Sequence, residues 1–321
     1  MIEKAPLRFH PYFKTVIWGG DKIGRYKGIS RLEPNVGESW EISAVPGHES
    51  VVAEGSYEGL NIVELIERFG ADILGSSVVR RYNGRFPLLI KFIDANDNLS
   101  VQVHPDDSLA MERHGSLGKT EMWYIIESEK GARIYSGLNR RITAGDYLRL
   151  VADDEFQNVL AEHEAGPGDV FFLPAGRVHA IGAGNLLAEI QESSDITYRI
   201  YDYGRRDASG NMRELHTEQA KDAIDYEVYE NYKSPRPNED PGRHEIARCE
   251  HFVTHRINLN GDMTLPLCGE SFTVIICVAG EAELRYPGGE SPMKAGETVL
   301  IPAAMSSLSL SGQATLLTTH C

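Results

Sequence analysis

Four side chains that are spread along the chain have the chemistry of metal ligands. Gln102 and His104 lie two positions apart in the segment LSVQVHP, in which apolar and polar residues alternate. On a β-strand they share one face, and Pro105 favours extended geometry at the histidine before it. A carboxylate, Glu121, precedes a strand-like segment, and a second imidazole, His179, follows the turn PAGRV. We therefore expect these four side chains to converge inside one barrel.

Two imidazoles, one carboxylate and one amide carbonyl form a mixed nitrogen and oxygen ligand set. Such a set suits Zn²⁺, and it also accepts Mn²⁺, Fe²⁺, Co²⁺ or Ni²⁺. Because Glu121 is the one anionic member of the set, a bound divalent cation would keep a net positive charge and act as a Lewis acid. Taken singly, each residue also fits a structural role, such as a solvated strand face, a surface ion pair or a hydrogen-bonded histidine.

The order of these elements resembles the metal-binding cupins, with Gln-x-His where most cupins have His-x-His. The chain further resembles the type I mannose-6-phosphate isomerases, in the shorter bacterial form that lacks a long helical insertion. The segments that carry this resemblance are QVHPD (102–106), KTEM (119–122), PAGRVHA (174–180), VIWGG (16–20), GESWEIS (37–43) and SDITYR (194–199). The last segment replaces an Arg-Ala-Gly version in the longer enzymes. The likeness runs from about residue 10 to residue 205 and is weaker beyond.

The resemblance implies a role for several residues. The four side chains described first correspond to the metal ligands of the family. Arg199 corresponds to its active-site arginine, and Glu189 to an acidic residue proposed as the proton-transfer base. Lys119 and Lys91 match lysines near the substrate, and Ser100 matches a serine near the phosphate. The catalytic set is then Arg199, Glu189 and Lys119, and the phosphate-binding set is Lys91, Ser100 and Arg199.

The reaction implied by the resemblance is the interconversion of mannose 6-phosphate and fructose 6-phosphate through an enediol, with Zn²⁺ as cofactor. Other functions stay open at this point. The chain could act on glucose 6-phosphate or as an epimerase, it could be a redox cupin such as a dioxygenase, or it could bind a sugar phosphate without turnover. Lysines and an arginine near the site fit a phosphorylated substrate better than oxygen chemistry.

The charge of the chain restricts its partners. With 32 basic and 47 acidic residues, the 321-residue chain carries a formal charge of −15. Nucleic acids and anionic membranes need a basic surface, so neither is expected as a partner. A sugar phosphate must be held by a local basic cluster. No obligate protein partner is evident. The N-terminal segment lacks the apolar core of a secretory signal, and the four cysteines contain no CxxC pair, which predicts a cytoplasmic protein.

The elements that must position these residues are mainly short strands separated by glycine and proline turns, typical of an antiparallel sandwich or barrel. A helical segment is predicted near 58–80, with Asn61 as its N-cap, and a second helical stretch near 213–230. Strands are predicted at 88–93, 99–104, 122–126, 132–135, 170–173, 254–259, 273–278, 282–286 and 298–301.

An internal repeat predicts two barrels of the jelly-roll cupin type. Residues 166–179 (GPGDVFFLPAGRVH) and 295–308 (AGETVLIPAAMSSL) share glycine, an acid, an apolar strand and Pro-Ala. Ser307 stands in the second copy where His179 stands in the first. We therefore expect a catalytic metal-binding barrel over 1–231, a proline-rich linker over 232–243, and a degenerate barrel without metal ligands over 244–321.

Overall fold

The computed structural model describes residues 2–206 and 209–321; residues 1, 207 and 208 of the predicted catalytic region lie outside it. Strands hold 41% of the chain and helices 17%, which confirms a mainly β fold. Every strand predicted from the sequence overlaps an observed one. The helices are α1 (Lys22–Lys27), α2 (Ile62–Phe69), α3 (Ala71–Leu74), α4 (Ser76–Tyr82), α5 (Asp107–His114), α6 (Ala144–Ala152), α7 (Thr217–Ala223) and the 3₁₀ helix η1 (Phe156–Val159).

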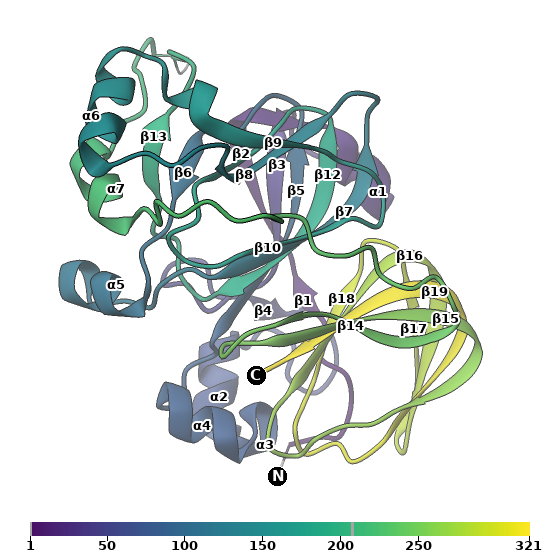
Figure 1. Cartoon of the computed structure of the whole chain (residues 1–321). Coiled ribbons are helices and arrows are strands. Elements are labelled where there is room, and N and C mark those ends of the chain that lie inside the picture. Colours follow the sequence, from purple (N-terminus) through teal and green to yellow (C-terminus); the bar gives the residue numbers. More distant parts are fainter. Residues whose placement is uncertain (1, 207–208) are drawn as a thin grey trace.

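Two antiparallel sheets face each other in the N-terminal part of the molecule (Figure 1). The first has the order β10 (Val170–Leu173), β7 (Glu121–Ser128), β12 (Asn185–Glu192), β5 (Leu88–Ala95), β3 (Val36–Ile42) and β2 (Tyr12–Gly20). The second has the order β13 (Tyr198–Tyr201), β6 (Val101–Val103), β11 (His179–Ile181), β8 (Arg133–Leu138) and β9 (Leu160–Glu164). A two-stranded sheet joins β1 (Phe9–His10) to β4 (Val51–Val52).

The first sheet is buried on both faces. Every residue of β5 and of β12 is buried, and both strands carry charged residues among their apolar ones, such as Lys91 and Glu189. One face packs Ile93, Ile125 and Leu187 against the second sheet. The other face packs Phe92 and Ile190 into the core shared with the C-terminal part of the chain. Polar residues on the inner face of such a sheet are therefore enclosed, which is the setting that a buried site needs.

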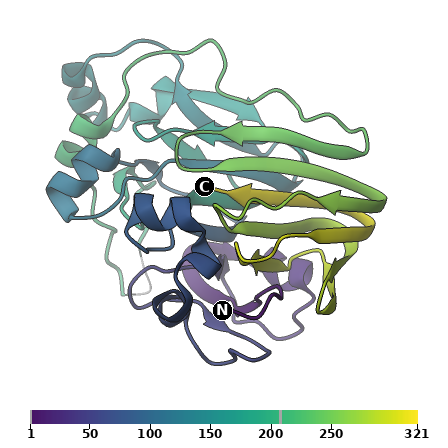
Figure 2. The ribbon, with the colours of Figure 1, turned by 90° about the horizontal axis from the view of Figure 1, so that it is seen from below.

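The C-terminal sheet has the order β14 (Gly242–Arg248), β15 (Val253–Leu265), β19 (Leu308–His320), β16 (Thr273–Tyr286) and β17 (Gly289–Lys294), with β18 (Thr298–Ile301) paired to β16. Figure 2 shows its long strands, in green and yellow, lying side by side. The prediction of separate strands at 273–278 and 282–286 was wrong, because β16 runs through both. A bulge between Cys277 and Ala279 lets the strand bend without ending.

The repeated segments make the same backbone contact in both parts of the molecule. In the first copy, the amide of Ile125 donates to the carbonyl of Asp169 at 2.9 Å. In the second copy, the amide of Cys277 donates to the carbonyl of Glu297, also at 2.9 Å. The strands that follow, β10 and β18, pair with β7 and β16 in the same antiparallel sense. The repeat seen in the sequence is thus a repeat of local structure.

Helices lie in both segments that were predicted to be helical, but they are shorter than predicted. Asn61 caps α2 by accepting from the amides of Val63 and Glu64, as predicted. The segment then forms three short helices, because Gly70 and Gly75 adopt φ values of 47° and 85° that interrupt a helix. The stretch near 213–230 is helical only in α7 (Thr217–Ala223). In the described residues, no helix is both long and apolar enough to span a membrane.

Candidate active site and metal centre

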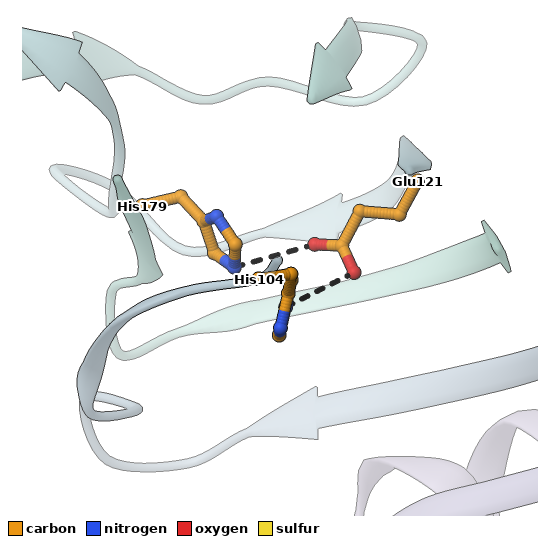
Figure 3. A group of neighbouring side chains, drawn as sticks. All are labelled: His104, Glu121 and His179. Carbon is orange, nitrogen blue, oxygen red and sulfur yellow. Dashed lines mark ion pairs between the residues drawn. The ribbon is translucent and has the colours of Figure 1, made fainter. Parts of the chain in front are cut away.

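Three of the four predicted ligands meet between the two facing sheets. His104 follows β6 directly, Glu121 begins β7 and His179 begins β11. The carboxylate lies between the rings: Oε2 is 3.5 Å from Nε2 of His104, and Oε1 is 3.4 Å from Nε2 of His179 (Figure 3). All three side chains are at most 1% exposed. Their ligand atoms lie within 4.8 Å of one another, so one ion can touch all three residues.

Both histidines are oriented by their other ring nitrogen. Nδ1 of His104 is 2.9 Å from the carbonyl oxygen of Ile196, and Nδ1 of His179 is 2.8 Å from that of Arg177. This leaves each Nε2 directed at Glu121. His104 Nε2 and both oxygens of Glu121 are buried without any hydrogen-bond partner. Buried polar atoms are normally paired, and metal-binding histidines are normally held through the second nitrogen, so these residues fit a divalent cation.

The surroundings of the two histidines favour neutral rings, which is the form that binds a metal ion. Burial, assisted by the charge of Lys119, lowers the pKa of His104 well below its usual value. Burial also lowers the pKa of His179 to about 4. Both rings are therefore neutral at pH 7, as ligation requires. Burial and the nearby Glu189 carboxylate raise the pKa of Glu121 to about 8, although Lys119 opposes this. A cation at this point would supply the missing counter-charge.

Gln102, the fourth predicted ligand, lies beside the other three. It pairs with His179 in the β6–β11 ladder, and its Nε2 is 3.2 Å from Nε2 of that ring. Its Oε1 accepts a hydrogen bond from Ser100 Oγ at 3.3 Å. The amide nitrogen thus faces the centre, and a half-turn of the amide would bring the oxygen to it. Ser100, predicted near the phosphate, is 3% exposed and supports Gln102.

A cavity of about 340 Å³ opens against Gln102. This volume lies within the range of small-molecule sites. Its lining brings together five cationic and three anionic side chains: Lys14, Lys91, Lys119, Arg199 and Arg213, and Glu38, Glu189 and Asp195. The formal charge of the cavity wall is therefore +2 in a chain of −15. This is the local basic cluster that a phosphorylated substrate requires in an acidic protein.

Glu189 and Lys91 form a buried pair on the cavity wall. The Nζ of Lys91 is 3.2 Å from Oε2 of Glu189 and 3.5 Å from Oε2 of Glu38. Trp123 Nε1 donates to Oε1 of Glu189 at 2.8 Å. Burial alone would raise the pKa of Glu189, but the charges of Lys91 and Lys119 outweigh it and lower that pKa. The Glu189 carboxylate is therefore ionised and able to accept a proton.

Lys119 stands between the metal centre and the cavity. It is 4% exposed, and its Nζ lies 3.4 Å from Oε2 of Glu121. It also lines the cavity together with Lys91. The loop before β7 places it there, because the amide of Lys119 donates to the carbonyl of Pro105 at 3.1 Å. The lysine can thus contact both a ligand and a bound molecule.

Arg199 lines the cavity from the strand next to Gln102. It lies opposite Gln102 in the β13–β6 ladder, and its Nη1 donates to the carbonyl of Glu214 at 2.9 Å. Of its neighbours, Tyr198 contacts His114, and Asp202 binds Arg205 and Arg213. The Nε of Arg199 is buried and has no hydrogen-bond partner among the residues that the structure describes. Its guanidinium therefore keeps donor capacity for a ligand.

Sequence reasoning missed three charged residues of the cavity. Lys14, on β2, is 3.7 Å from Glu38, on β3, and Arg213 donates from Nε to Asp202 at 2.8 Å. Glu38 belongs to the segment GESWEIS that carried part of the resemblance, and its side chain also accepts from Trp40 at 2.7 Å. No local pattern marks Lys14 or Arg213, because the strand order brings Lys14 to this cavity and the contact with Asp202 brings Arg213.

The sequence of this chain is similar to those of enzymes from one family. A profile of the type I phosphomannose isomerase catalytic domain matches residues 7–132, and a profile of the mannose-6-phosphate isomerase cupin domain matches residues 243–321. Mannose-6-phosphate isomerase ManA of Bacillus subtilis is 36% identical over 318 residues, which is 98% of both chains. Mannose-6-phosphate isomerase of Streptococcus mutans is 31% identical over 323 residues, again 98% of both chains.

The fold agrees with these matches. The crystal structure of the mannose 6-phosphate isomerase from Bacillus subtilis has a TM-score of 0.89 and 33% identity, covering 99% of this chain and all of that one. The predicted cupin fold and the resemblance noted in the sequence are confirmed. The structure also brings His104, Glu121 and His179 together as a candidate metal centre. The chain therefore belongs to the type I phosphomannose isomerase family, the enzymes also called mannose-6-phosphate isomerases.

Proposed function

We propose that this chain interconverts mannose 6-phosphate and fructose 6-phosphate in the cavity beside His104, Glu121 and His179. The observation that carries the proposal is the position of Glu189. It is an ionised carboxylate, 3% exposed, on the wall of a cavity that also holds cationic side chains and abuts a candidate metal centre. A base, a charge-stabilising centre and a phosphate-binding cluster are the three parts that aldose–ketose isomerisation of a sugar phosphate needs.

Zn²⁺ is the cofactor that we assign to the centre. His104, Glu121 and His179 would hold it, and Gln102 would add its carbonyl oxygen after the amide turns. The bound ion would supply a Lewis acid that polarises the sugar oxygens at C1 and C2. The ligand set is the same mixture of nitrogen and oxygen donors that zinc sites use.

Proton transfer is assigned to Glu189. Its Oε2 faces Lys91 at 3.2 Å and makes no hydrogen bond to the described residues, while Trp123 donates to Oε1, so Oε2 is the oxygen that we assign to the proton. The carboxylate takes the proton from C2 of the opened sugar, which leaves an enediolate with its negative charge on O1. A proton then moves from O2 to O1, and the carboxylic acid returns its proton to C1, so that the ketone forms at C2 and Glu189 is ionised again. Lys91 keeps the base ionised before the substrate arrives, and Lys119 and Arg199 face the cavity to stabilise negative charge on the substrate oxygens.

The phosphate is assigned to the cationic side of the cavity. Arg199 offers a fork that matches two phosphate oxygens, and Lys91 adds a point charge. Ser100 now donates to Gln102 at 3.3 Å, and its hydroxyl would turn to the phosphate when the Gln102 amide turns to the metal centre. Because the whole chain is acidic, these local charges must overcome the unfavourable long-range field, and the formal +2 of the cavity wall supports this assignment.

The domain bounds and the location of the protein are also part of the proposal. We propose a catalytic barrel over residues 1–231, a connection over 232–243, and a C-terminal barrel over 244–321 that is structural. Ser307, which replaces the histidine of the first repeat, is exposed. A cytoplasmic location is part of the proposal, supported by four free cysteines, which suit a reducing compartment.

A comparison of substrates tests the proposal. The zinc-loaded protein is assayed with mannose 6-phosphate, glucose 6-phosphate and fructose 6-phosphate, with and without oxygen. We expect mannose and fructose phosphates to interconvert equally well in air and under anaerobic conditions, and glucose 6-phosphate to be inert. Equal turnover of glucose 6-phosphate, oxygen dependence, or binding of all three sugars without turnover would each reject it.

A further inference from the structure

A second group of metal-binding side chains lies where the N-terminal and C-terminal parts of the molecule meet. Asp107 begins α5, Glu192 ends β12, and His251 lies in the turn between β14 and β15. One ligand atom from each residue falls within 4.8 Å of the other two. These residues are outside the catalytic cavity, and the reaction described above uses none of them.

Two facing atoms of this group are buried and make no hydrogen bond in the part of the chain that the structure describes. Glu192 is 2% exposed and His251 is 7% exposed. Nδ1 of His251 lies 3.0 Å from Oε1 of Glu192, yet neither atom makes a hydrogen bond. The catalytic centre shows the same feature, since His104 Nε2 and the oxygens of Glu121 also face each other without hydrogen bonds. Buried polar atoms in this state call for a partner that is not a protein donor.

Each of the three side chains makes a second contact through its other polar atom, and this contact fixes its orientation. Oε2 of Glu192 accepts from the amide of Thr120 at 2.8 Å, and Oδ1 of Asp107 accepts from the amide of Gly118 at 2.7 Å. Nε2 of His251 faces Oε1 of Glu250 at 3.4 Å. In metal sites, such contacts at the second polar atom of each ligand orient the ligands. A carboxylate next to the second nitrogen of an imidazole is a common example. The group therefore has the organisation of a built site.

The acidic side chains of this group favour the binding of a cation. Burial and the neighbouring Asp107 carboxylate raise the pKa of Glu192 to about 8, despite its bond to Thr120. Burial lowers the pKa of His251, so the ring is neutral. The nearby cation, Arg81, is paired with Glu250 at 3.5 Å and donates to the carbonyl of that residue. Among the residues that the structure describes, no lysine or arginine forms an ion pair with these two acidic side chains or the neutral imidazole.

We propose that Asp107, Glu192 and His251 bind a second divalent cation that fastens the C-terminal sheet to the catalytic barrel. Two carboxylates and one imidazole suit Zn²⁺ and Mn²⁺. The exposed side chain of Asp107 leaves room for water to complete the coordination. Because the three ligands come from α5, β12 and the β14–β15 turn, the ion would join elements that are far apart in the chain.

The site also adjoins the strand that carries a catalytic ligand. Thr120 donates its amide to Glu192, and the amide of Glu192 donates back to the carbonyl of Thr120 at 3.1 Å. Thr120 precedes Glu121. A cation on Glu192 would therefore fix the start of β7 from the outside, without touching the substrate cavity.

Zinc counting in the full-length protein tests this proposal, independently of turnover. The protein is stripped with a chelator, dialysed against Zn²⁺ and analysed for bound zinc per chain. We expect two ions in the wild type, one in His251→Gln, one in Glu121→Gln and none in the double variant. His255→Gln is the control: this histidine lies on the same C-terminal sheet, contacts Arg243, and should leave the count at two.

Asp107→Asn is the second variant, because an exposed residue can be changed with little effect on folding. We expect it to weaken the second zinc site on the order of 10- to 100-fold. Added Zn²⁺ should raise the melting temperature of Glu121→Gln and leave that of Glu121→Gln/His251→Gln unchanged. The proposal is overturned if the wild type binds one ion that Glu121→Gln abolishes, or if His251→Gln still binds two. In that case a proton shared between Glu192 and Asp107 fills the position.

Discussion

Glu189 and Lys91 lie directly opposite each other on neighbouring strands, and their charged atoms are 3.2 Å apart in the wall of the cavity. Both side chains are at least 96% buried. Burying two charges costs desolvation free energy, and further hydrogen bonds or charges must offset this cost. Trp123 and Glu38 provide these contacts here, at 2.8 Å and 3.5 Å. The result is a carboxylate that stays ionised in a place where a carboxylate alone would be protonated.

The first prediction concerns the base. Glu189→Gln should lower kcat by about 10²- to 10⁴-fold, the usual contribution of a positioned proton-transfer group. The amide keeps the shape and can still accept from Trp123, so the bound zinc should change little. The melting temperature should fall, because Lys91 loses the partner at 3.2 Å and keeps only Glu38 at 3.5 Å. Steady-state kinetics with mannose 6-phosphate, together with elemental analysis, make the comparison. A variant with wild-type kcat would remove Glu189 from the reaction.

The second prediction concerns the hydrogen bond that positions this base. Trp123→Phe removes the donor to Glu189 and keeps most of the apolar volume, so it should cost activity but less than Glu189→Gln. A hydrogen bond to a charged group contributes roughly 1.5–3 kcal/mol, which corresponds to about 10- to 150-fold. We expect kcat to fall by no more than this and KM to stay nearly constant. A larger loss than in Glu189→Gln would contradict a purely positioning role.

The third prediction concerns the phosphate. Arg199→Ala should reduce kcat/KM by about 10- to 100-fold, because a charge-assisted contact to the phosphate is lost. The zinc content should be unchanged. Arg141→Ala is the matched control, since Arg141 is an exposed arginine that pairs with Glu227 away from the cavity. If both variants behave alike, Arg199 does not contact the substrate.

The fourth prediction follows from the pKa of Glu38. Burial opposes ionisation of this carboxyl, but Lys91 and Lys14 outweigh burial and lower its pKa from 4.5 to about 2. A depressed carboxyl pKa stabilises the fold above the unfolded value, and that contribution is lost as the pH falls from about 4.5 towards 2. The free energy of unfolding of the wild type relative to Glu38→Gln should therefore drop by about 2 kcal/mol between pH 6 and pH 3.

Urea unfolding at both pH values measures this difference. The variant also loses its ion pair at every pH, so only the change with pH reports the titration of Glu38. A constant difference between the two proteins from pH 6 to pH 3 would show that the pKa of Glu38 is not depressed.

Much of the site could be predicted because its residues sit in local patterns. The alternation in LSVQVHP placed Gln102 beside Ser100, and the structure confirms this with a 3.3 Å contact. The turn before His179 put that ring at the start of a strand, as observed. The convergence of His104, Glu121 and His179 required one further inference, that their strands close into one barrel. Strand periodicity and turn residues predicted the individual elements, and the resemblance to the type I mannose-6-phosphate isomerases implied the cupin fold and the set of ligands.

Other features depended on contacts that no local pattern records. Arg213 reaches the cavity because Asp202 holds it at 2.8 Å. The helix predicted over 213–230 ends at Ala223, and the chain then runs without regular secondary structure until Tyr232 packs against Gly137 and donates to Leu138 at 2.9 Å. Such tertiary contacts override helical propensity.

The most direct test of the central claim is the turnover of mannose 6-phosphate by one preparation, measured before chelation, after chelation and after Zn²⁺ is restored. In parallel, Glu121→Gln is measured with the same zinc added. We predict that turnover disappears with the metal, returns when zinc is restored to the wild type, and stays absent in Glu121→Gln. Full turnover by metal-free protein, or by Glu121→Gln, would contradict the proposal that His104, Glu121 and His179 hold the ion on which isomerisation depends.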